Sequence, residues 1–151
     1  VAGRAGRGGR RGEVIIQTYW ATHPAIVAVA RHDRARFEGY ELGQREEAYY
    51  PPFSRVCNVT VSGKSERLVH ERTDELARYV REAVLDLDGE WEGLGPAECV
   101  RARVKDRFRR HIVLKCPVGA EPGPILAAAA SRLPARRDVS LAIDVDAYDM
   151  M

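Results

Sequence analysis

Hydrophobic and polar positions alternate in several stretches of the chain beyond residue 50, which predicts the strands of a half-buried sheet. Two stretches between them repeat their apolar positions at helical spacing, which predicts two helices. The predicted elements are a strand at 55–61, a helix at 65–87, strands at 100–105 and 107–115, a helix at 124–133 and a strand at 139–145. This β-α-β-β-α-β order is typical of a ferredoxin-like domain of the α+β class, with helices on one sheet face and the other face open to water or a partner.

The first part of the chain predicts a strand followed by two helices. Residues 14–19 form a short β-rich run of the kind found in a buried strand. Thr22 is expected to cap a short helix that carries Pro24 in its first turn and ends near Arg31. Asp33 is expected to cap a second helix.

The double proline at 51–52 is expected to end that second helix, because proline supplies no amide donor and restricts the residue before it. We therefore place a domain boundary there. The predicted organisation is an N-terminal segment at 1–20, a helical linker at 21–50 and a compact domain at 51–151, which together make an α/β chain.

Composition narrows the class of protein. Hydrophobic residues make up 45% of the chain and charged residues 30%, which is the balance of a soluble globular protein. No apolar run approaches the roughly 18 residues that a membrane span needs. The three cysteines form no C-x-x-C pair and the four histidines do not cluster, so we predict no metal site and buried, reduced thiols in a cytoplasmic protein.

Charge is informative through its distribution, because the formal net charge is only +2. Six of the 24 basic residues lie between positions 101 and 110, in the predicted hairpin. If its two strands pair with their basic positions on one face, a basic strip results. The candidate DNA-binding residues of this strip are Arg101, Arg103, Lys105, Arg107, Arg109, His111 and Lys115. The core face would then carry Val100, Ala102, Val104, Phe108, Ile112 and Leu114.

Three interpretations of the basic strip stay open. It contacts the DNA backbone without reading sequence, it receives an acidic segment of a protein partner, or it is a solvated face balanced by nearby acids such as Asp144 and Asp146. Those two aspartates are expected to form salt bridges or an exposed strand face rather than a metal pair.

Residues 3–7, Gly-Arg-Ala-Gly-Arg, carry the chemistry of the N-terminal segment. Glycine permits a close backbone approach, and an arginine guanidinium can fork onto phosphate oxygens. In motor ATPases such an arginine neutralises the charge that builds on the γ-phosphoryl group during hydrolysis. The alternative is an Arg/Gly-rich tail, since the bias continues to residue 12. Because the chain starts inside this motif and without methionine, we expect a piece of a longer protein.

Five strings occur in an order that identifies a resemblance. The strings VAGRAGR, GEVIIQTY, HPAI, YPPFSR and IDVDAY resemble, in that order, the C-terminal part of the primosomal protein N′ (PriA) family of replication-restart DNA helicases. The resemblance implies that residues 1–20 end the second helicase lobe and that residues 51–151 form an S10-like domain that touches DNA at branched forks. It also implies that Arg7 is the arginine finger and Arg4 a supporting contact, both catalytic, and that the nucleotide-binding residues are Gly3, Arg4, Gly6 and Arg7.

The resemblance implies a function for the parent protein. The family unwinds DNA 3′ to 5′ with ATP and magnesium, carries structural zinc, binds single-stranded DNA-binding protein and assembles the primosome at stalled forks. The phosphate-binding loop and the zinc cysteines are not in these residues, so we expect no cofactor, no ATP hydrolysis and no zinc in this chain. The expected partners are forked or single-stranded DNA, single-stranded DNA-binding protein and other primosome proteins. The alternative is a non-enzymatic ferredoxin-like module that binds nucleic acid or protein.

Overall fold

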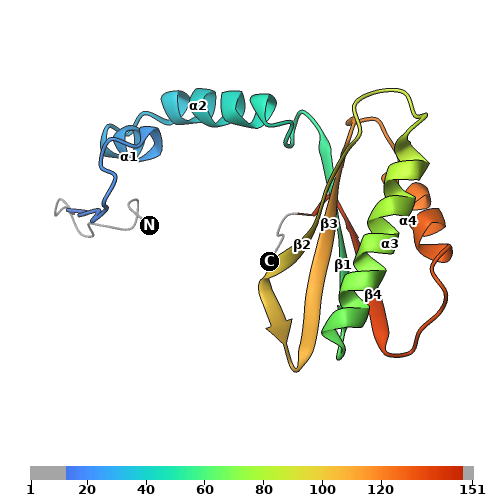
Figure 1. Ribbon diagram of the computed structural model, residues 1–151. Coiled ribbons are helices and arrows are strands. Elements are labelled where there is room, and N and C mark those ends of the chain that lie inside the picture. The colour runs from blue at the N-terminus through green and yellow to red at the C-terminus, as the bar shows by residue number, and fades with distance from the viewer. Residues whose placement is uncertain (1–12, 148–151) are drawn as a thin grey trace, which may run out of the picture. The chain divides into compact units, whose positions relative to one another are not determined.

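A computed structural model of the chain describes residues 13–147 (Figure 1). The chain divides into two compact units, residues 1–42 and 43–151. The predicted boundary at the double proline therefore lies inside the second unit. The expected phosphate-contacting residues Gly3, Arg4, Gly6 and Arg7 lie outside the described residues.

The first unit contains the helix α1 (Pro24–Ala30) and most of α2 (Arg34–Glu47), which continues into the second unit. The predicted cap of α1 was wrong by one residue. His23 is the N-cap, and its Nδ1 accepts a hydrogen bond from the Ala25 amide at 3.2 Å. The Asp33 cap of α2 is confirmed, since its Oδ1 accepts from the Arg36 amide at 3.0 Å.

The strand predicted at 14–19 is wrong. These residues form no strand, and their apolar side chains are exposed, Ile15 to 85%. A single extended segment satisfies its backbone hydrogen bonds only beside another strand, and none of the residues 13–147 pairs with it. Residues that favour a strand therefore do not form one here, because no other described strand pairs with them.

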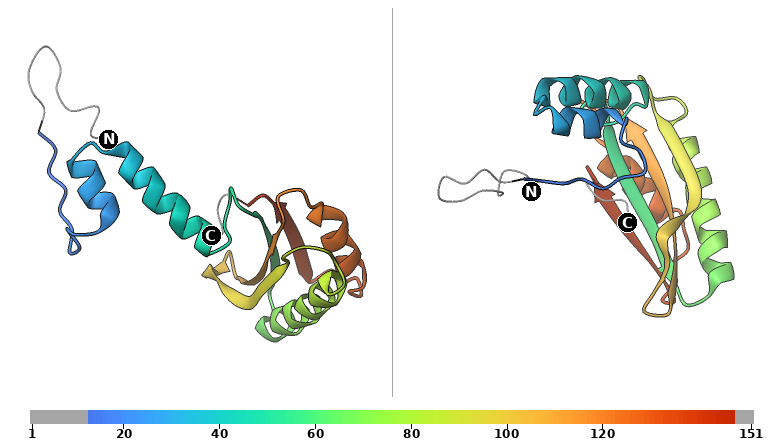
Figure 2. Two further views of the ribbon diagram at one scale, coloured as in Figure 1. Left: turned by 90° about the horizontal axis from the view of Figure 1, so that it is seen from above. Right: turned by 90° about the vertical axis from the view of Figure 1, so that its left-hand side faces the viewer.

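The second unit has the predicted β-α-β-β-α-β order. Its elements are β1 (Arg55–Gly63), α3 (Glu66–Val84), β2 (Glu92–Val104), β3 (Arg107–Cys116), α4 (Pro122–Ser131) and β4 (Val139–Val145). The strands form one antiparallel sheet in the order β2-β3-β1-β4. Both helices cover the same face of the sheet (Figures 1 and 2), which confirms the ferredoxin-like α+β prediction.

The core lies between the sheet and the two helices. Cys57, Val59 and Val61 of β1 are almost fully buried, as their alternation predicts. The other core side chains come from α3, β3 and α4, namely Val69, Leu76, Ala77, Val80, Ile112, Leu114, Leu126 and Ala129. The Ser65 cap of α3 is also confirmed, because its hydroxyl accepts from the Leu68 amide at 3.4 Å. All three cysteines are free and buried.

Candidate nucleic-acid interface

The turn of the β2–β3 hairpin decides which basic residues share a face. Lys105 and Asp106 both have positive φ, 48° and 56°, as the two-residue turns that match strand twist require. This turn pairs Val104 with Arg107, and therefore Arg103 with Phe108. Paired residues of an antiparallel sheet point to the same face.

The predicted single basic strip is therefore wrong. Arg103 shares its face with Phe108, which packs against the core, and its guanidinium carbon lies 5.1 Å from the centre of the Phe108 ring. Arg107 and Arg109 point to the opposite, helix-free face. The expectation that Arg110 points away from the strip is confirmed, because it lies on the helix side and bonds Asp74 of α3 at 3.1 Å.

The core positions predicted on β2 were also wrong in part. The pairing of β2 with β3 shifts between Leu94 and Ala97 and again between Glu98 and Arg103. Extra residues on one strand reverse the faces of the side chains that follow them. Val100 is accordingly 77% exposed while Cys99 beside it is buried. Arg101 lies in this irregular stretch and is exposed.

Lys115 does not lie on an accessible surface. Only 5% of the residue is exposed. Its ammonium group donates to the Ala48 carbonyl and pairs with a carboxylate oxygen of Glu92, both at 2.9 Å, and lies 4.3 Å from the centre of the Tyr50 ring. These contacts hold the ammonium inside the second unit and favour a structural role for Lys115 over the predicted contact with DNA.

His111 lies on the helix-free face of β3, opposite Thr60 of β1. Partial burial, together with the charge of Arg109, lowers the pKa of its imidazole below the ordinary value. Its Nδ1 is buried without a hydrogen-bond partner in the described part of the chain. The ring is therefore neutral near pH 7 and adds no positive charge to the interface.

The fold gathers a second set of cations that sequence spacing did not reveal. Gly63 ends β1, pairs with Phe108 on one side and with Val139 on the other, and a Cβ there would lie 3.0 Å from the Asp138 carbonyl. Three connections thus meet at this end of the sheet: the β1–α3 turn, the β2–β3 turn and the α4–β4 loop (Figure 1).

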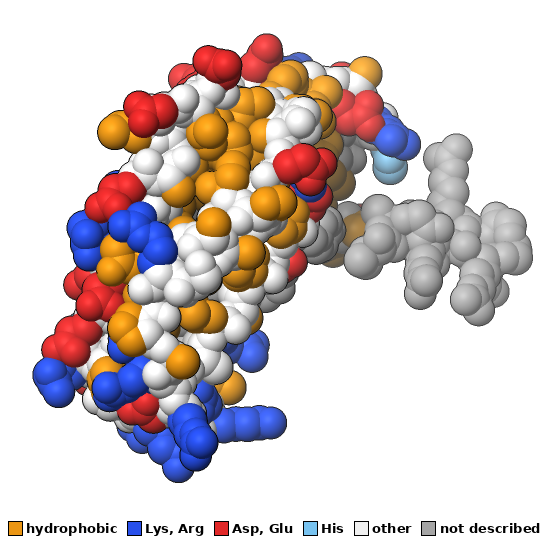
Figure 3. Space-filling model, turned by 90° about the vertical axis from the view of Figure 1, so that its right-hand side faces the viewer, with side chains coloured by type: hydrophobic (Ala, Val, Ile, Leu, Met, Phe, Trp, Pro, Cys, Tyr) orange, Lys and Arg blue, Asp and Glu red, His pale blue; other side chains and the backbone are white. Residues whose placement is uncertain are grey.

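We call this surface the basic end. Its cations are Lys64, Arg67, Arg103, Lys105, Arg107, Arg136 and Arg137. Figure 3 shows Lys and Arg side chains gathered at the lower end of the second unit. The structure thus keeps Arg103, Lys105 and Arg107 from the predicted strip and joins them to residues of two other loops.

Arg107 connects three strands at the basic end through hydrogen bonds. One of its terminal nitrogens, Nη2, donates to the Ser62 carbonyl and to the Ser140 hydroxyl, both at 2.9 Å. The guanidinium of β3 therefore reaches across β1 to β4. Its position is fixed by these bonds, so it orders the surface around it.

Acidic residues neutralise only part of the basic end. Arg67 pairs with Glu71 at 2.6 Å, Arg103 with Asp106 at 2.9 Å and Arg136 with Asp138 at 3.4 Å. Lys64, Lys105 and Arg137 have no ion pair within residues 13–147. Three uncompensated cations from three separate loops make this end attractive to an anion such as a phosphodiester backbone.

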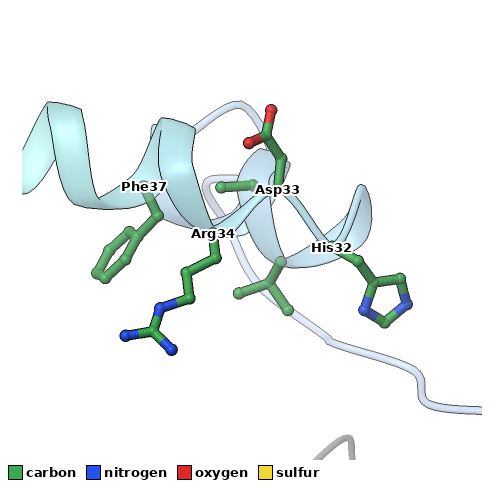
Figure 4. A pocket seen from close by; sticks show the side chains of 6 residues that line it. His32, Asp33, Arg34 and Phe37 are labelled. Carbon is green, nitrogen blue, oxygen red and sulfur yellow. The ribbon is translucent and has the colours of Figure 1, made fainter.

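The first unit carries a shallow hollow of about 310 Å³ around His32, Asp33, Arg34 and Phe37. In Figure 4 the Arg34 and Phe37 side chains point the same way, whereas Asp33 points away from them. Arg34 Nε also donates to Glu38 at 2.6 Å. The lining thus brings no acid and base together, and we assign it no chemistry.

Residues 13–147 show no sign of two other kinds of site, a metal centre and a membrane-spanning helix. No three His, Cys, Asp or Glu side chains come together as a metal-binding group. No helix in this part of the chain has the length and apolar character needed to cross a bilayer. Asp146 forms a salt bridge, as one of the two expectations for it stated, but its partner is Arg55 of β1 and not the β2–β3 hairpin. Its carboxylate accepts two hydrogen bonds from Arg55, at 2.8 and 2.7 Å.

The second unit is a small ferredoxin-like domain with a basic end, and comparison with known proteins places it in a family. Residues 46–148 match the family model of the primosomal protein N C-terminal domain. The chain is 40% identical over 117 residues to the replication restart protein PriA of Synechocystis sp., a match that covers 78% of this chain and 14% of that protein.

Two further relatives agree. The replication restart protein PriA of Bacillus subtilis is 31% identical over 154 aligned residues, which cover 100% of this chain and 19% of the relative. That of Treponema pallidum is 39% identical over 119 residues, or 78% of this chain and 17% of the relative. The chain belongs to the primosomal protein N C-terminal domain family, and it spans less than a fifth of the length of these relatives.

Proposed function

We propose that the chain is the C-terminal part of a cytoplasmic, ATP-dependent 3′–5′ DNA helicase that acts in replication restart, and that its second unit binds DNA through the basic end. The names of the relatives support the role in replication restart. The helicase activity, its polarity and the cytoplasmic location rest on the resemblance of the sequence motifs alone. The second part rests on one observation: Lys64, Lys105 and Arg137 belong to three loops that meet at one end of the sheet, and none of them has an ion pair within residues 13–147.

The proposed contact is with phosphates. Lysine and arginine that neutralise phosphates position a protein on DNA without reading its sequence. The loops that carry these cations project from one end of the sheet (Figure 1), which suits a fork junction or a single strand. Single-stranded DNA-binding protein and other primosome proteins are proposed as partners of the parent protein.

The nucleotide chemistry is proposed for the parent protein alone. Arg7 would act there as an arginine finger with Arg4 in support, and Gly3 and Gly6 would allow the close approach to ATP and magnesium. Zinc would also belong to the parent. This sequence contains neither a phosphate-binding loop nor a C-x-x-C pair, so we propose that it neither hydrolyses ATP nor holds zinc. Sustained ATP turnover by the purified chain would overturn this part.

Fluorescence anisotropy with forked, single-stranded and duplex DNA tests the DNA-binding part. We expect binding that weakens steeply between about 50 and 200 mM salt. Replacing Lys64, Lys105 and Arg137 together by Gln is expected to weaken binding to all three DNAs. Absence of binding at low salt would contradict the proposal and leave the alternative, a module that binds a protein partner.

A further inference from the structure

An apolar cleft of about 340 Å³ opens beside the basic end, between the end of α4 and the strand β4. Its apolar walls are Val61, Ala130, Leu133, Pro134, Ala135, Val139 and Leu141, and two arginines, Arg72 and Arg136, complete the lining. Val61 is fully buried, whereas Leu141 is 40% exposed. The cleft therefore runs from the surface down to the core.

The cleft exists because α4 is too short to cover β4. The helix ends at Ser131, and β4 is the last strand of the sheet, paired only with β1 among the described residues. The helix-facing side chains of β4 therefore stay partly in water. Its outer backbone edge also keeps N–H and C=O groups that no neighbouring strand uses.

The two arginines keep donors for a ligand. Arg72 is mostly buried and uses Nη1 for Glu75 at 3.0 Å, and Arg136 uses Nε for Asp138 at 3.4 Å. A guanidinium has five N–H donors in a planar fork and stacks on flat π-systems. The cleft thus combines apolar walls with planar groups that can both stack and donate.

Continuity with the basic end indicates the occupant. Arg136 belongs both to the cleft lining and to the basic end, and Arg137 follows it directly. Figure 3 shows hydrophobic side chains exposed on this side of the second unit, next to the Lys and Arg of its lower end. A strand whose phosphates lie on the basic end has its bases within reach of the cleft.

We propose that this cleft is a pocket for one unstacked base of a single DNA strand, held by the basic end through its phosphates. The proposal rests on the DNA binding proposed above. The faces of a base are apolar and every base can stack, so such a site tolerates sequence. The edge of every base carries ring-nitrogen or carbonyl acceptors, to which the guanidinium groups of Arg72 and Arg136 can donate. The volume lies at the lower end of small-molecule sites, about 300–1,000 Å³, as suits a single ring system.

The test compares two fluorescein-labelled oligomers in anisotropy with the whole chain. One is a short oligothymidylate, and the other has the same length and phosphates but abasic sugars throughout. We expect the thymidylate to bind about tenfold more tightly, which corresponds to about 1.4 kcal/mol. Equal affinities would overturn the base pocket and leave the phosphate interface standing. If neither oligomer binds, the proposed function fails and this inference fails with it.

Matched variants locate the effect. Leu141→Thr removes part of the apolar wall and introduces a β-branched residue suited to a strand. Ile143→Thr makes the same kind of change two residues away on the same strand face, at similar exposure (38%) but outside the cleft. We expect Leu141→Thr alone to reduce the preference for thymidylate over the abasic oligomer. Equal preferences in both variants and the unmodified chain would overturn the proposal, because the base would then not lie in the cleft.

Discussion

The ammonium of Lys115 lies over the Tyr50 ring, 4.3 Å from its centre. This contact joins β3 to the chain that leads from α2 into β1. The same ammonium donates to the Ala48 carbonyl and pairs with Glu92, while the Tyr49 hydroxyl donates to the Glu90 carbonyl at 3.0 Å. Both tyrosines therefore fasten the segment before β1 to the edge of the sheet that begins β2. A lysine that sequence spacing assigned to DNA has a structural role.

Replacing Lys115 with Met should destabilise the second unit without weakening DNA binding. The change leaves the Ala48 carbonyl without its donor in a part-buried place, which costs about 1–3 kcal/mol for an unsatisfied group. Urea unfolding should show this loss of unfolding free energy, and anisotropy at a temperature where the variant is folded should show unchanged affinity.

Lys105→Met is the matched control for that experiment. Lys105 lies in the exposed hairpin turn, where a substitution usually changes stability by no more than about 0.5 kcal/mol. We expect it to weaken DNA binding and to leave unfolding almost unchanged. The prediction about Lys115 is wrong if the two variants show the same pattern, or if Lys115→Met alone reduces affinity.

Changes at Asp106 should strengthen both the turn and the interface. Asp106 has φ of 56°, a conformation that glycine adopts without the steric cost of a Cβ. Asp106→Gly should stabilise the second unit by about 0.5 kcal/mol, because relief of the left-handed backbone exceeds the entropy cost of glycine. It should also raise DNA affinity, because it removes the carboxylate that pairs with Arg103.

Asp106→Asn separates the two effects in that experiment. It removes the charge but keeps a side chain, so we expect higher DNA affinity and little change in stability. Thermal unfolding and anisotropy measured on both variants check the pair. Unchanged affinity in both variants would show that the carboxylate does not face the bound DNA.

The sequence was sufficient for the order of elements in the second unit, because most of these elements are regular. It was not sufficient for β2, which begins at Glu92 rather than at residue 100. Alternation in β1 and β4 and helical spacing in α3 indicate which side chains face the core. The periodicity is clear because apolar residues are required on the face that packs against the core. The strand expected at 14–19 failed for the complementary reason. Its composition favours a strand, but a strand depends on a partner that composition does not describe.

The interface was harder to predict because it depends on register and on loops. Simple alternation put Arg103 and Arg107 on one face, but a two-residue turn pairs Arg103 with Phe108 instead. The two register shifts place extra residues on β2 relative to β3, and the pattern of apolar and polar positions does not predict them. Lys64 and Arg137 are 73 positions apart in the sequence (137 − 64), and only the return of β4 beside β1 brings their loops to one end.

The salt dependence of DNA binding should show how many phosphates the basic end contacts, because its slope is proportional to that number. If Lys64, Lys105 and Arg137 each neutralise one phosphate, replacing all three by Gln should reduce the slope of log affinity against log salt. The reduction should be about 2 for a single strand and about 2.7 for a duplex, at roughly 0.7 and 0.9 per contact. Anisotropy titrations at a series of salt concentrations measure the slope.

Arg34 and Arg101 provide controls for that count. Arg34 lies in the first unit and is already paired with Glu38, so Arg34→Gln should leave the slope unchanged. Arg101 is exposed on the irregular part of β2, outside the three loops of the basic end. If Arg101→Gln reduces this slope more than the triple change does, the DNA contacts lie on β2 and not on the basic end.

Protonation of His111 should weaken the second unit in mildly acidic solution. Burial and the charge of Arg109 lower the pKa of this imidazole in the folded chain, whereas an unfolded chain titrates near about 6.5. The unfolded state therefore binds more protons as the pH falls below about 6.5, and the free energy of unfolding decreases with it. Below the lowered folded pKa the decrease from this residue stops.

His111→Gln cannot bind that proton, so its unfolding free energy should change less over this window. Urea unfolding at a series of pH values from about 7.5 to 5 compares the two chains above the range where carboxylates titrate, about 4. Parallel pH profiles would show that His111 does not control acid sensitivity, and a separate titration of its ring by NMR would then be expected to give an ordinary pKa.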